Sequence, residues 1–207
     1  MAKLDIKNFN ITGLYDNELE GITQEKVIEL LSITGDEAKN LFFLGIGSNR
    51  VFVIPDRNLE IKFESNRLIV NNKTEGNDNP EFIIETFIKL QGLIEESELK
   101  AYGFNLDINA TADNEIDWNK FLNNDFLKNI NATDTLINAS IKIKKHLPDD
   151  VISVLELIPS EEKNVIGVHL NRHFNLSELK KMEIIVSDFL SFIKESMVDT
   201  DKLLTLK

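Results

Sequence analysis

Apolar and polar residues alternate along much of the chain, which is the pattern of β-strands that bury one face. Residues 58–64 show it most clearly, because Leu59, Ile61 and Phe63 fall on one face and charged residues fall on the other. The same alternation, or a short apolar run between turn residues, predicts the other strands. We expect strands at residues 8–12, 41–46, 50–54, 58–64, 67–71, 101–110, 136–146, 151–158 and 165–173.

Helical periodicity and capping residues predict helices between these strands. Thr23 is a suitable N-cap for a helix that Gly35 would stop, and Pro80 is suited to the first turn of the next one. The last helix carries a broad apolar stripe behind a capping box. The expected helices span about residues 23–33, 80–98, 118–128 and 175–197.

The order of strand, helix, antiparallel strands and helix occurs once before Lys100 and once after it. Local matches follow the same order, such as Phe9-Asn10-Ile11 with Phe104-Asn105-Leu106, at offsets of 93 to 98 residues. Chance matches in a chain rich in Asn and Ile remain the alternative. The pattern indicates an internal duplication.

The predicted fold class is therefore α+β, with two tandem β-α-β(3-4)-α units whose antiparallel sheets are covered by helices. The first unit covers residues 1–100, and the second covers residues 101–207 with a C-terminal helix and tail. Edge strands of the two units could pair around a pseudo-twofold axis. Such a curved sheet resembles the saddle of TATA-box-binding proteins in topology, although no residue motif of that family is present.

Charge and composition narrow the class of partner. The 207 residues carry a formal net charge of −12, which argues against binding to nucleic acid or anionic lipid. Residues 75–125 hold twelve acidic side chains and three Lys. The sequence has no Cys and no apolar run of membrane-spanning length, and its first residues lead us to expect no signal peptide. We expect a cytoplasmic protein that does not enter a membrane.

A weakly basic polar face is the best candidate for a binding site. Its expected residues are Lys142, Lys144, His146, His169, Asn171 and His173. They could bind an anion, RNA or a protein partner, or they could form an ordinary solvated face, because antiparallel sheets commonly have one wet side. His169 and His173 would lie about 13 Å apart on one strand, so they could not share a metal ion without a bend.

Catalytic and cofactor motifs are missing from the sequence. It lacks the serine, zinc-protease and β-lactamase signatures, so we assign no catalytic residue, no metal and no cofactor. Residues 45–49 lightly resemble a phosphate loop but lie between two predicted strands, where a hairpin turn is expected. The acidic set Asp107, Asp113, Glu115 and Asp117 lacks the Gly and Glu that a calcium loop requires.

The leading interpretation is a non-enzymatic protein-binding or assembly protein of a prokaryotic or phage-type cytoplasm. We expect a homodimer, because the last helix is apolar beyond one stripe and residues 151–158 call for cover on both faces. One alternative is an acidic inhibitor or nucleic-acid mimic that occupies a basic cleft on a partner. Another is a ligand-binding or enzymatic domain that uses the His-containing sheet face. The sequence does not identify the protein partner.

Overall fold

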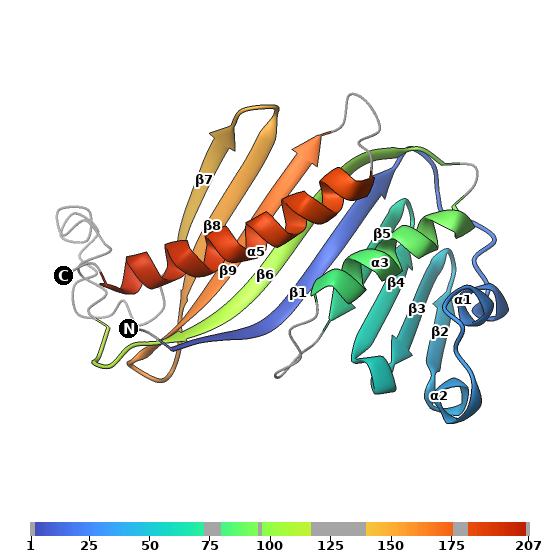
Figure 1. The fold of residues 1–207 in the computed structure, drawn as a ribbon, viewed down its shortest axis with the longest axis horizontal. Coiled ribbons are helices and arrows are strands. Elements are labelled where there is room, and N and C mark those ends of the chain that lie inside the picture. Colours follow the sequence, from blue (N-terminus) through green and yellow to red (C-terminus); the bar gives the residue numbers. More distant parts are fainter. Residues whose placement is uncertain (1–2, 73–79, 95–96, 117–139, 176–181, 206–207) are drawn as a thin grey trace.

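All the described strands hydrogen-bond into one antiparallel sheet in the order β2-β3-β4-β5-β1-β6-β9-β8-β7 (Figure 1). The computed structural model describes residues 3–72, 80–94, 97–116, 140–175 and 182–205. The strands are β1 (Lys3–Tyr15), β2 (Phe42–Ile46), β3 (Asn49–Ile54), β4 (Leu59–Glu64), β5 (Arg67–Asn72), β6 (Leu99–Thr111), β7 (Ile141–Leu147), β8 (Val151–Pro159) and β9 (Val165–Asn175).

The prediction of two tandem units, each covered by its own helices, is wrong. β1 and β6 pair with each other from Lys3↔Thr111 to Tyr15↔Leu99, so the strands on either side of this pair belong to a single nine-stranded sheet. The physical reason is that two separate sheets would each leave a long strand with unpaired backbone groups at an edge. The internal duplication and the two-unit division stay predictions.

Few helices accompany this sheet, and the two longer described ones lie on the same face of it (Figure 1). Phe87 and Leu90 of the helix Pro80–Leu90 belong to the same core as Phe189 and Phe192 of the helix Met182–Thr205. Among the described residues, no helix is long and apolar enough to cross a bilayer. The helices are α1 (Gln24–Leu30), α2 (Gly35–Asn40), α3 (Pro80–Leu90) and α5 (Met182–Thr205), with short 3-10 turns η1 (Pro55–Arg57) and η2 (Gln91–Leu93).

Several helix boundaries differ from the predicted ones. Thr23 caps α1 as expected, accepting a hydrogen bond from the Lys26 backbone N–H at 3.4 Å. Gly35 does not stop that helix but begins α2, with a positive φ of 59° that glycine adopts without strain. The last helix continues to Thr205, beyond the predicted end at Met197. The predicted helix at 118–128 lies outside the described residues.

Aromatic rings fill the core between α5 and the sheet. Phe104 lies at the centre, with its ring centroid 4.9 Å from that of Phe189 and 5.3 Å from that of Phe174. Tyr102 donates a hydrogen bond from its hydroxyl to Asp188 Oδ2 at 2.9 Å. Arg172 forms an ion pair with Glu195 at 2.9 Å. These contacts fix α5 across β6 and β9.

The helix-side face of the sheet packs against α3 and α5, and the distal face is the opposite one. Side chains alternate between the faces along each strand, so the register assigns every residue to one of them.

The expectation that residues 151–158 are covered on both faces is wrong. Val151 and Leu157 are buried on the helix-side face, whereas the distal positions of β8 stay partly exposed.

Replacement of Phe104 by Ala should destabilise the protein by about 3–5 kcal/mol, because it leaves a cavity among packed rings. Chemical denaturation followed by circular dichroism measures the effect. Phe42→Ala is the matched control, since the Phe42 side chain is exposed and should lose well under half as much. Equal losses in the two variants would contradict the described core.

Candidate functional site

The six predicted site residues lie together on the distal face of β7 and β9. The register places them in three rows, each with one residue of β8 in the middle. Residues two strands apart lie about 10 Å from each other, since neighbouring strands are about 4.8 Å apart. The rows are Lys142–Glu156–His169, Lys144–Val154–Asn171 and His146–Ile152–His173.

Two polar contacts lie in and beside the first row, one between β7 and β8 and the other between β9 and β6. Lys142 Nζ lies 3.3 Å from Glu156 Oε2, and His169 Nδ1 lies 2.6 Å from Asp107 Oδ1 on β6. Asn8 of β1 donates from Nδ2 to the other Asp107 oxygen at 3.1 Å. Polar and charged side chains therefore follow one row from β7 across the sheet to β1.

The other two rows have an apolar side chain between the predicted residues. Val154 separates Lys144 from Asn171, and Ile152 separates His146 from His173. His173 instead contacts Asn175 of its own strand, with Nε2 2.9 Å from Oδ1. The structure thus places the six residues on one face but does not join them into a single constellation.

A row of asparagines next to the charged row was missed from the sequence. Asn171 donates from Nδ2 to Asn105 Oδ1 at 2.7 Å, and Asn105 donates from Nδ2 to Asn10 Oδ1 at 2.7 Å. Thr12 adds a hydroxyl donor to the same Asn10 oxygen at 3.3 Å. This amide relay joins β9, β6 and β1. Its signal in the sequence was Asn at the polar positions of all three strands, but the contacts depend on register.

Two acceptors on the same face have no hydrogen-bond partner among the residues that the structure describes. Asn71 is buried and donates to Glu60 Oε1 at 3.2 Å, yet its Oδ1 accepts no hydrogen bond. The Oδ1 of Asn8 is likewise buried and unpaired. A buried acceptor without a donor reduces stability, so this part of the face is not optimised for stability alone.

Asp107 and His169 shift each other's proton affinity. The hydrogen bond to Asp107 raises the pKa of His169 above 6.5, although partial burial acts in the opposite direction. Burial raises the pKa of Asp107, but the hydrogen bonds from His169 and Asn8 outweigh it and hold that pKa below 3.8. The pair is therefore fully ionised at mildly acidic pH and carries a protonated imidazole there.

The charged row can exchange protons and form hydrogen bonds, but its described neighbours include no nucleophile positioned against His169. Asp107 orients the ring through Nδ1, which leaves Nε2 as the nitrogen available to another molecule. Within the described part of the chain, no group of three His, Asp or Glu residues could hold a metal ion.

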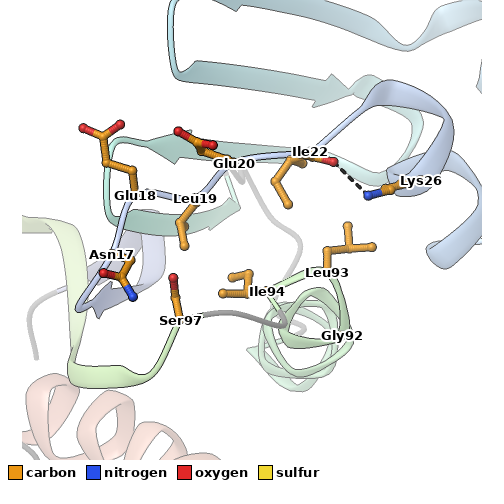
Figure 2. A pocket seen from close by; sticks show the side chains of 11 residues that line it. Asn17, Glu18, Leu19, Glu20, Ile22, Lys26, Gly92, Leu93, Ile94 and Ser97 are labelled. Carbon is orange, nitrogen blue, oxygen red and sulfur yellow. Dashed lines mark hydrogen bonds between the residues drawn. The ribbon is translucent and has the colours of Figure 1, made fainter.

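A cavity of about 730 Å³ lies elsewhere, between the segment that follows β1 and the turn η2. Figure 2 shows Leu19, Ile22 and Ile94 lining it, while the carboxylates of Glu18 and Glu20 point outward. Lys26 donates from Nζ to the Gly21 carbonyl oxygen at 2.9 Å. No His lines this cavity or a smaller neighbouring one, so neither contains the predicted site residues.

An exposed apolar surface occupies the opposite end of the distal face from the His and Lys residues. Phe42, Leu44 and Ile46 of the edge strand β2 are 56%, 44% and 65% exposed. Register places them on the distal face beside Val51 and Val53 of β3. We call these five residues the β2 stripe. The sequence pattern predicted the strands here but not the exposure of their apolar residues.

The turn that follows β2 keeps this hairpin tight. Gly47 has a φ of 60°, as the first central residue of a two-residue hairpin turn requires. The turn Gly47-Ser48 joins Ile46 to Asn49, its partner on β3. The phosphate-loop resemblance of residues 45–49 therefore corresponds to a β-hairpin.

Comparison with known proteins adds no further identification, because no family model and no curated protein matches the chain.

The Asp107–His169 pair should make stability depend on pH. His169 contributes to the unfolding free energy below its unfolded pKa of about 6.5. This contribution is lost as pH rises through the higher pKa that His169 has in the folded protein. The contribution of Asp107 to the unfolding free energy is lost as pH falls through the lowered pKa that Asp107 has in the folded protein. The unfolding free energy lost in Asp107→Asn should thus be largest near about pH 5–6.

Nuclear magnetic resonance titration tests the same pair directly. Asp107→Asn should lower the pKa of the His169 imidazole, whereas Asp150→Asn should leave it in place because Asp150 accepts a hydrogen bond from Asn175 instead. An unchanged His169 titration in Asp107→Asn would show that the pair is not formed in solution.

Replacement of Asn105 by Ala should cost about 1–3 kcal/mol of stability, because it removes both contacts at the centre of the amide relay. Asn109→Ala is the matched control on the same strand and face, and its side chain makes no hydrogen bond within the described residues. The losses are compared by equilibrium denaturation. A smaller loss for Asn105→Ala than for Asn109→Ala contradicts the relay.

Proposed function

We propose that the chain is a non-enzymatic protein-binding and assembly protein of the cytoplasm, and that the β2 stripe is its contact surface. The observation that carries this proposal is the contrast between the two edge strands of the sheet. The distal positions of β7 hold Lys142, Lys144 and His146, whereas the equivalent positions of β2 hold three exposed apolar side chains.

Edge strands in soluble proteins are commonly protected by charged side chains, especially Lys. β7 follows this rule, but residues 40–49 around β2 contain no charged residue in a chain whose net charge is −12. α1 and α2 lie beside β2 (Figure 1), yet its distal side chains stay exposed. An apolar edge that is left uncharged favours a surface that another polypeptide covers.

The size of the stripe fits this interpretation. With about 150–250 Å² for a large side chain, the exposed fractions of Phe42, Leu44 and Ile46 amount to about 300 Å² of apolar surface. Patches of that size on a monomer are often functional. The contact would gain free energy by removing this area from water, without any catalytic group.

The two other interpretations receive less support. The acidic region at 75–125 falls partly outside the described residues, so its carboxylates do not form a described surface. A ligand-binding face would be favoured by a pocket that contains a His, and the two cavities described above contain none. The homodimer expected from the sequence is a finer form of the leading proposal.

A photo-crosslinking residue at position 44 tests the contact surface. Leu44→benzoylphenylalanine, expressed in the native host and irradiated, should give adducts with one or a few discrete polypeptides. Ile184→benzoylphenylalanine is the matched control, because Ile184 is also 44% exposed but lies on α5. No adduct at position 44, or the same adducts from both positions, would reject the β2 stripe as the contact surface.

A further inference from the structure

We infer that the polypeptide that covers the β2 stripe is a second copy of this chain, related by a twofold axis that passes beside Leu44. The inference rests on the proposed function, since it names the partner of the same surface. It follows from the chemistry of the stripe, from the charges around the sheet and from the position of the stripe at one end of the distal face.

The stripe is complementary to itself. Leu44 is the middle of its three exposed β2 residues, with Phe42 and Ile46 two positions away on either side. In an antiparallel twofold arrangement, Leu44 meets the partner's Leu44, and Phe42 meets the partner's Ile46. In such a contact the Phe42–Ile46 pair occurs twice and the Leu44 pair lies on the axis, as an isologous interface requires.

Charge does not oppose this contact locally. Two chains of net charge −12 repel each other, but residues 40–49 bring no charged side chain to the seam. The acids of α2 are partly neutralised, since Asp36 pairs with Lys39 and Glu37 pairs with Arg57 of η1. The repulsion therefore acts at a distance, where salt screens it, and the association should strengthen as ionic strength increases.

The arrangement stops at two copies. Each chain carries one β2 stripe, and a twofold contact uses both stripes fully. The opposite end of the distal face presents Lys142, which is 63% exposed, together with Lys144 and His146. A third copy would have to place its uncharged stripe against these cationic side chains, which gains nothing. A closed dimer is expected instead of an open fibre.

The area of the stripe sets the strength of the dimer. Two stripes would bury about 600 Å² of apolar surface, which is below the roughly 1,200–2,000 Å² of stable protein interfaces. The dimer should therefore be reversible and depend on concentration. Light scattering should give an average mass that rises from the 23.6 kDa of one chain towards twice that value as concentration increases.

Cysteine crosslinking tests the register of this dimer, because the chain has no Cys of its own. With a bismaleimide crosslinker that spans about 10 Å, Leu44→Cys should form a covalent dimer much faster than Ile184→Cys, which has the same exposed fraction. Phe42→Cys alone should crosslink slowly, whereas a mixture of Phe42→Cys with Ile46→Cys should crosslink quickly. The stripes cover each other only if the two sheets pack face to face, where their backbones lie about 10 Å apart, beyond the reach of a direct disulfide.

Leu44→Lys provides a second test that needs no crosslink. It should weaken self-association at least about tenfold, because it places two ammonium groups at the twofold axis. Ile46→Lys should act likewise, and the far-ultraviolet circular dichroism of both variants should match wild type because both positions are exposed. Lys144→Leu, at the other edge strand, is the control that should leave association unchanged.

The outcomes separate the inference from the proposed function. A constant mass of one chain at all concentrations, or crosslinking at position 44 no faster than at position 184, overturns the second copy as partner. If position 44 then gives adducts with a different polypeptide in the native host, the proposed function stands and only the inference fails. If it gives none there either, both fail.

Discussion

The pairing of β1 with β6 is the interaction on which the rest of the structure depends. It joins residues that lie almost a hundred positions apart in sequence, such as Ile11 and Phe104, along the whole length of two thirteen-residue strands. Without it, each long strand would present unpaired backbone groups at an edge. With this pairing, the sheet continues through β5 on one side and β9 on the other, and α3 and α5 pack on one continuous core.

That pairing also determines how the distal face is organised. Asn10 and Asn105 face each other across the central pair, and Asn171 extends the contact to β9, so the amide relay crosses the junction between the two sides of the sheet. Buried or half-buried amides that match only in one register disfavour strand slippage. The charged row beside them reinforces the same junction through Asp107, which contacts both Asn8 and His169. The apolar β2 stripe lies at the end farthest from the lysines of β7.

Local patterns revealed the strands but not their partners. The alternation around Ile61 predicted β4, because a half-buried strand needs no knowledge of its neighbours. The pairing that makes the sheet continuous depends on long-range contacts, which no local pattern contains, so the sequence offered it only as one way in which two units could meet. The six candidate residues lie on one face, but Val154 and Ile152 lie between them, and the polar contacts of Lys142 and His169 go to Glu156 and Asp107, which only the register identifies. The exposure of Leu44 on the distal face is likewise not contained in the local pattern.

Native-state hydrogen exchange tests most directly whether the sheet is one unit centred on β1 and β6. The account predicts that the hydrogen-bonded amides of these two strands, such as those of Ile11 and Phe104, exchange slowest in the protein and only through global unfolding. Exchange should become faster outward towards β2 and β7. If the β1–β6 amides exchanged faster than those that pair β4 with β5 and β8 with β9, the two sides of the sheet would open independently, and the account would be contradicted.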